Sequence, residues 1–200
     1  MNPRTPMPSQ LFLADKVISY LQIELGKLSW LDLTFGRVQK LVKDVNGISI
    51  YYPAYYMDSG EYKSMLPDQG LGNFAFFIID DPQGVAWNKN GKSIISCPFS
   101  LVVWYDLSKI NGEPSLRNTE TVKQILLNAI HRTLIPDEGS SVSIENIYEK
   151  AENIYKGFTN AVGMAKGQAS SEVSSQFMMQ PFNAIRFEGT LKYRESCQTL

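Results

Sequence analysis

The chain has 200 residues, of which 44% are hydrophobic, and its 19 basic and 20 acidic residues leave a formal net charge of −1. This length and composition predict one globular domain with a substantial core. A near-neutral chain has no overall field that attracts nucleic acid or an anionic membrane, and no apolar run approaches the roughly 20 residues that span a bilayer.

The first predicted elements are an extended arm and a helix. Residues 1–8 contain three prolines, which favour an extended N-terminal arm, and they lack the apolar core of a signal peptide. A cytosolic folding compartment is therefore expected. Ser9 then offers a helix cap, and apolar residues recur at helical spacing until Gly26 ends the helix. These apolar residues are Leu11, Ala14, Ile18, Leu21 and Leu25.

A hairpin is the next predicted element. Residues 37–45 and 48–56 flank Asn46-Gly47, a dipeptide that favours a type I′ turn because both central residues need positive φ. The second arm carries four tyrosines, and strand alternation places two of them on each face. They are Tyr51, Tyr52, Tyr55 and Tyr56.

Two further strands are predicted in the middle of the chain. Residues 74–79 form a short apolar run, and residues 99–105 are rich in aromatic and β-branched residues. Between these strands, residues 83–96 are expected to form a loop or a second hairpin.

The second half of the chain predicts two helices and a long loop. Asn118 or Thr119 caps the first helix. The second helix is expected over 144–158, where helical spacing places Ile144, Ile147, Tyr148, Ala151, Ile154, Tyr155 and Phe158 on one face. Residues 157–180 are expected to form a long mobile loop, because they lose this periodicity.

The closing segment 182–194 alternates strictly between apolar and polar residues. This pattern predicts a half-buried antiparallel strand with a wet outer face, which returns to the early hairpin. The apolar face carries Ile185, Phe187, Leu191 and Tyr193, and the polar face carries Arg186, Glu188, Thr190, Lys192 and Arg194.

The predicted order of elements indicates the α+β class. We expect a mostly antiparallel sheet of about five strands, with the N-terminal helix and the two later helices packed on one face. The single domain is expected to span residues 9–194, between the arm at 1–8 and a tail at 195–200.

Residues that carry chemistry are few. His131 is the sole histidine and lies near the end of a predicted helix, which favours a surface position over an acid/base role. Cys97 and Cys197 are expected to be free thiols in a reducing compartment, with a disulfide between them as the alternative. We assign no catalytic, metal-binding or cofactor-binding residue.

A metal site is considered for one group of acids. Clustered carboxylates bind hard cations, so these acids would serve a metal-dependent nuclease. Acids that solubilise loops and end strands are the preferred interpretation. The group comprises Asp58, Glu61, Asp68, Asp80 and Asp81.

The chain opens with an amphipathic helix at 11–25 and a hairpin around Asn46-Gly47, continues with a strand and helix over 99–134, and closes with an alternating strand at 185–194. In this order the elements resemble those of the small tail-terminator, tail-completion and head–tail connector (neck) proteins of tailed bacteriophages. The resemblance implies a ring-forming structural virion protein without an active site, which caps a tail tube or joins it to the portal.

The resemblance also sets the expected partners. The expected partners are further copies of this chain, and also portal, connector or tail-tube subunits. The protein is expected to be made in the bacterial host cytoplasm and to function in the virion. No cofactor, no membrane contact and no strong nucleic-acid contact is expected. Ring subunits need two different contact surfaces. The interface candidates are Tyr51, Tyr52, Tyr55, Tyr56, Met178, Met179, Arg186 and Arg194.

Two alternatives stay open at this point. Exposed tyrosines suit base stacking as well as protein contacts, so the Tyr51–Tyr56 face would serve a nucleic-acid-binding or peptide-binding module. The less favoured alternative is the nuclease that uses the acids between residues 58 and 81. A further interpretation of the tyrosines is that a loop of the same chain covers them.

Overall fold

The computed structural model describes residues 11, 13–45, 47–57, 60–67, 70–87, 93–110, 118–136, 139–158 and 181–194. Several expectations lie outside these residues. They are the arm at 1–8, most of the loop at 157–180, the tail at 195–200, and the side chains of Asp58, Asp68, Met178, Met179 and Cys197.

The main sheet is built around one long strand, β7 (Ser93–Asp106). The strand order is β1-β5-β7-β9-β8, with β6 (Gly84–Trp87) also paired to β7. β5 and β6 pair with successive parts of β7, so these two shorter strands share one edge of β7. All described pairs in this sheet are antiparallel except β1–β5. The remaining strands are β1 (Leu33–Arg37), β5 (Phe74–Ile79), β8 (Ser141–Tyr148) and β9 (Phe182–Arg194).

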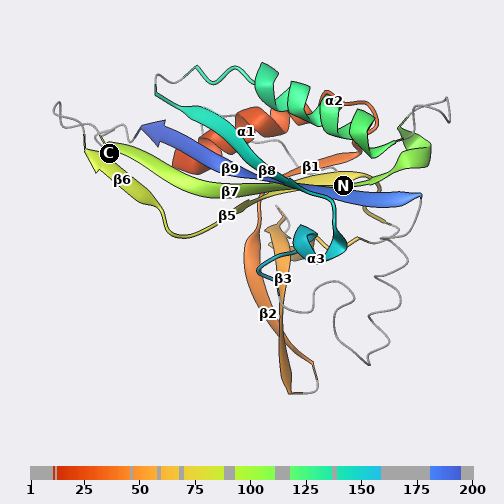
Figure 1. The fold of residues 1–200 in the computed structure, drawn as a ribbon. Helices are drawn as coiled ribbons and strands as arrows, with labels where there is room; N and C mark the ends of the chain where they lie inside the picture. The colour runs from red at the N-terminus through yellow and green to blue at the C-terminus, as the bar shows by residue number, and fades with distance from the viewer. Residues whose placement is uncertain are drawn as a thin grey trace.

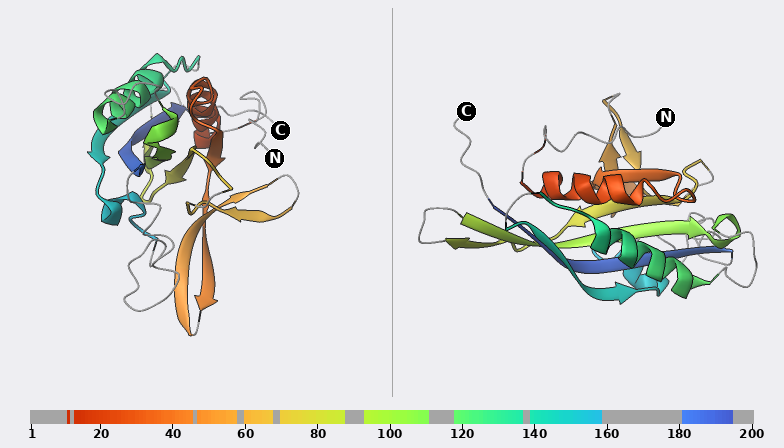
Figure 2. Two further views of the ribbon diagram at one scale, coloured as in Figure 1. Left: turned by 90° about the vertical axis from the view of Figure 1, so that its right-hand side faces the viewer. Right: turned by 90° about the horizontal axis from the view of Figure 1, so that it is seen from above.

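Two helices cover one face of this sheet, α1 (Leu13–Leu25) and α2 (Thr119–Arg132), as Figures 1 and 2 show. Asn118 caps α2 by accepting a hydrogen bond of 2.8 Å from the backbone N–H of Thr121. Apolar residues of both helices pack against alternate residues of β7 and β9 in one core cluster. The predicted α+β class is therefore confirmed, and so are the first helix, which begins at Leu13, the hairpin and the strands at 74–79, 99–105 and 182–194. In place of one sheet of about five strands, the described chain has a six-stranded sheet and a separate three-stranded sheet.

The opposite face of the sheet is also covered. A small sheet of β2 (Gln39–Val45), β3 (Ile48–Tyr56) and β4 (Tyr62–Ser64) lies on that side, with the short helix α3 (Ala151–Ile154) (Figure 1). A second core cluster forms there around Phe35, Phe74 and Phe76, with Ile154 and Tyr155 from the α3 region. The sheet is consequently a central layer, and α3 does not share a face with α1 and α2 as predicted.

The predicted helix over 144–158 is wrong. Residues 141–148 form the edge strand β8, and only residues 151–154 are helical. A register shift in β8 lies between Ile144 and Asn146. An extra residue at such a bulge turns a two-residue repeat into a three-residue step, which imitates helical spacing between Ile144 and Ile147.

The closing strand has a different environment from the one predicted. β9 lies between β7 and β8 rather than beside the hairpin. Its apolar face packs under the helices as expected, but its other face is not uniformly wet, because Arg186 is only 3% exposed. Gly189 allows β8 to approach closely, since a Cβ there would overlap the backbone carbonyl oxygen of Ser143. No helix within the described ranges is long and apolar enough to cross a bilayer.

Candidate interaction surfaces

The β2–β3 hairpin projects away from the main sheet (Figure 1). Val42 and Tyr51 are directly opposite each other on its two strands, and Tyr56 is opposite Tyr62 where β3 pairs with β4. All four side chains are exposed. The rings of Tyr56 and Tyr62 meet edge to face with centroids 5.2 Å apart. We call these four exposed residues the hairpin surface, although the regular register places Val42 and Tyr51 on the face of β3 opposite to Tyr56 and Tyr62.

The four tyrosines of β3 do not form one platform. Tyr52 and Tyr55 pack against the second core cluster, with the Tyr55 ring 5.3 Å from that of Phe35. Tyr51 instead lies under the ammonium group of Lys40, at 4.8 Å from Nζ to the ring centroid. The exposed pair is therefore Tyr51 and Tyr56, and the regular register of β3 keeps them on opposite faces, as alternation predicted. The same chain therefore covers two of the four rings, those of Tyr52 and Tyr55.

A second exposed apolar surface lies on β6. Val85 and Trp87 are two residues apart on this strand and are 54% and 74% exposed. In an extended strand this spacing places both side chains on one face. β6 pairs with β7 on one side, and no other strand of the described chain pairs with it. We call Val85 and Trp87 the β6 surface. The hairpin form of residues 83–96 is thus confirmed, but its exposed tryptophan was not singled out from the sequence.

The interface candidate Arg186 belongs to a buried polar network instead of a surface. Its Nη2 donates to Ser100 Oγ at 2.8 Å and lies 3.0 Å from Glu188 Oε1. Nη1 donates to the backbone carbonyl of Lys156 at 3.0 Å, in the turn that follows α3. The α3 region covers this face of β9, which is why a residue on the predicted wet face is buried. Arg194 is half-buried at the end of β9, next to Gly139.

The candidate metal ligands are not assembled into a site. Asp80 Oδ2 accepts a hydrogen bond of 3.2 Å from Ser100 and lies 3.7 Å from Arg186, whereas Asp81 and Glu61 are exposed. Within the residues described, no group of three or more His, Cys, Asp or Glu side chains is placed to hold a metal ion.

His131 is exposed in the last turn of α2, and Cys97 is a buried free thiol whose pKa is raised by burial.

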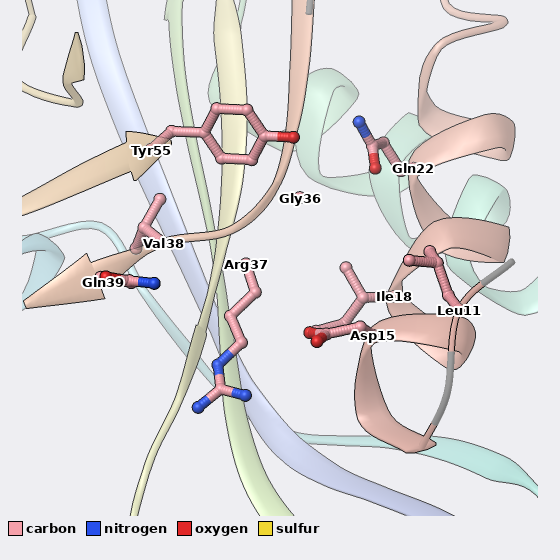
Figure 3. Close-up of a pocket in the computed structure, with 9 residues that line it drawn as sticks. All are labelled: Leu11, Asp15, Ile18, Gln22, Gly36, Arg37, Val38, Gln39 and Tyr55. Atoms are coloured by element: carbon pink, nitrogen blue, oxygen red, sulfur yellow. The ribbon is translucent and has the colours of Figure 1, made fainter. Parts of the chain in front are cut away.

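A groove runs beside α1 and consists of two adjoining cavities of about 410 and 380 Å³. Leu11, Asp15 and Arg37 line both cavities. Figure 3 shows the first, where Asp15, Ile18 and Gln22 of α1 lie across from the β1–β2 connection. Burial raises the pKa of the Asp15 carboxyl, and the Arg37 guanidinium opposes that shift. We call this feature the α1 groove.

The α1 groove was not predicted, although the sequence held one signal for it. Gln22 occupies the helical position between Ile18 and Leu25 on the inward stripe, where an apolar residue is expected. Its amide Nε2 donates to the backbone carbonyl of Thr34 at 2.6 Å. This bond occupies an acceptor on β1 that faces the helix.

No protein-family model matches this chain, and no curated protein matches it significantly.

Proposed function

We propose that the chain is a ring-forming structural subunit of a tailed-bacteriophage virion, at the head–tail junction or at the end of the tail. On this proposal the protein has no catalytic role. It contacts further copies of itself and portal, connector or tail-tube subunits. The proposal is based on the resemblance in the order of elements. The opening helix, the hairpin, the strand–helix pair and the closing strand on which this resemblance depends are all elements of the fold.

The observation that carries the proposal is the pair of exposed apolar surfaces. The hairpin surface lies on the small sheet of β2, β3 and β4, and β6, which carries the other surface, lies at one end of the main sheet (Figure 1). The two surfaces differ in composition and geometry. A ring is a heterologous assembly, in which one surface of each subunit contacts a different surface of the next.

Each surface has a feature that suits protein contacts. Tyrosine and tryptophan supply large, stiff contact areas and are enriched at interfaces. An edge strand with unpaired backbone groups also accepts a strand from a neighbour. Exposed Trp87 on the edge strand β6 combines both properties.

The two other functions receive less support. A base-stacking platform requires adjacent free rings, and two of the four tyrosines on β3 are packed against the core. A metal-dependent nuclease requires free carboxylates, and Asp80 is engaged by Ser100 and Arg186. Nuclease activity that depends on Mg²⁺ and is lost in Asp80→Asn would favour the enzyme over the ring subunit.

Mass photometry and sedimentation velocity of the full chain test the proposal. The expected result is one discrete oligomer, either alone or after a portal or tail-tube protein of the same virion is added. Negative-stain electron microscopy of the same sample should then show annular particles. A monomer that binds neither protein at micromolar concentration would contradict the proposal.

A further inference from the structure

The α1 groove contains two buried acceptors without a protein partner. Gln22 is fully buried, and because its Nε2 donates to Thr34, its Oε1 is fixed on the other side of the amide. Neither this oxygen nor Oδ1 of Asp15 has a hydrogen-bond partner among the described residues. Both residues line the groove. Unpaired buried acceptors favour a ligand that brings hydrogen-bond donors.

The charges in the groove select against ions. Among the described residues, Asp15 and Arg37 are the charged ones that line it, and they line both of its cavities. One carboxylate and one guanidinium cancel in formal charge, so the groove favours neither a cation nor an anion. A neutral group with hydrogen-bond donors at one end and an acceptor at the other matches this lining. Its donors meet the Asp15 carboxylate and the Gln22 oxygen, and its acceptor meets the Arg37 guanidinium. Peptide units and primary amides have that chemistry.

The shape of the groove favours an extended chain. The two cavities share Leu11, Asp15 and Arg37 in their linings, and Tyr55 lines the first cavity whereas Tyr193 lines the second. Apolar side chains such as Ile18 and Val38 line the walls between the polar groups. Two joined cavities, each with an aromatic side chain and spaced polar groups in its lining, suit a polypeptide segment better than a compact metabolite.

We infer that the α1 groove binds an extended, uncharged segment of a partner polypeptide. The N–H groups of the segment donate to Gln22 Oε1 and Asp15 Oδ1, and a carbonyl oxygen accepts from the Arg37 guanidinium. This site is separate from the hairpin and β6 surfaces, and the inference does not require ring formation.

Ligand-observed saturation-transfer NMR on the full chain tests the inference, because it works for a monomer and for a large oligomer. The probes are three blocked tripeptides: acetyl-Gly-Gln-Gly-methylamide and its central-lysine and central-glutamate analogues. We expect saturable binding of the glutamine peptide, at least about threefold tighter than that of either charged peptide. No saturable binding, or tighter binding of a charged peptide, would overturn the inference.

Variants locate the binding site. Arg37 is exposed, so Arg37→Met should keep the fold. It should lower the affinity for the glutamine peptide at least about threefold. Lys109→Met removes another exposed cation, outside the groove, and should leave binding unchanged. Gly36→Ala narrows the groove, since its Cβ would lie 3.4 Å from Gln22 Oε1, and should also weaken binding. Equal binding by Arg37→Met and Lys109→Met would place the peptide elsewhere and overturn the assignment.

One further comparison separates a partner from the chain itself. Binding that appears only after residues 1–10 are deleted would assign the groove to the chain's own N-terminal residues and overturn the partner assignment. The oligomer mass of each variant is measured on the same samples. A ring that forms without peptide binding would overturn this inference alone, and peptide binding by a permanent monomer would overturn the ring alone.

Discussion

Nη2 of Arg186 donates a hydrogen bond of 2.8 Å to Oγ of Ser100, across the antiparallel pair of β9 and β7. The same nitrogen lies 3.0 Å from Glu188, and Nη1 reaches the backbone carbonyl of Lys156 after α3. A single buried side chain therefore connects two strands of the sheet with the turn that covers them.

Replacement of Arg186 should destabilise the fold strongly. Arg186→Met leaves the partly buried Glu188 carboxylate with only the more distant Lys156 ammonium, at 3.9 Å, and leaves the Lys156 backbone carbonyl without this donor. The loss of one partner from a buried ion pair costs about 3 kcal/mol. Urea denaturation should show this loss in the free energy of unfolding. Lys192→Met on the same strand, where the side chain is exposed, should change stability by less than about 0.5 kcal/mol. Equal midpoints for the two variants would contradict the role of Arg186.

Gly189 should tolerate no side chain. In Gly189→Ala the new methyl group overlaps the carbonyl oxygen of Ser143, so β8 must move, at a cost of about 1–3 kcal/mol. Thermal unfolding followed by circular dichroism measures the effect. The matched control is Gly84→Ala in β6, where the nearest atom to the new Cβ is 3.8 Å away and little change is expected. Similar melting temperatures for both variants would argue against the close approach of β8.

Trp87 should dominate assembly if the ring proposal holds. Truncation of a central aromatic residue at an interface typically costs about 2 kcal/mol or more of binding free energy. This corresponds to about a 30-fold larger dissociation constant. Trp87→Ser should show this loss when oligomer mass is followed against protein concentration. Leu134→Ser removes an even more exposed apolar side chain, 86% against 74%, outside both named surfaces. Assembly that is equally weakened, or equally unaffected, in the two variants would exclude the β6 surface.

Alkaline pH should unfold the protein through its buried tyrosines. Burial raises the pKa of Tyr105 and of Tyr193 to about 12, and it also raises the pKa of Tyr155. A phenol with a raised folded pKa contributes stability that is present below its unfolded pKa near 10 and is lost as pH rises towards 12. The free energy of unfolding from urea titrations should fall across this window. The fall should be shallower in Tyr105→Phe, and an unchanged slope in that variant would contradict the assignment.

Local signals predicted most of the individual elements. Asn46-Gly47, the Asn118 cap and the alternation of Ile185, Phe187 and Leu191 each depend on neighbours in sequence, and each corresponds to an observed element. The failure at Ile144 also has a local origin, because a bulge shifts the strand repeat into helical spacing. The site was less predictable, since only Gln22 on the apolar stripe of α1 pointed to the groove.

The sequence by itself determined local conformation and the inward faces, because turn chemistry, capping and hydrophobic periodicity act over a few residues. The tertiary structure alone decided which strands became neighbours, and therefore which polar residues were buried. β9 pairs with β7 about 90 positions away, and residues 154–156 cover Arg186 from about 30 positions away. Such pairings depend on the whole set of packed surfaces. The same reason explains why Tyr51 and Trp87 are exposed while Tyr55 and Arg186 are not.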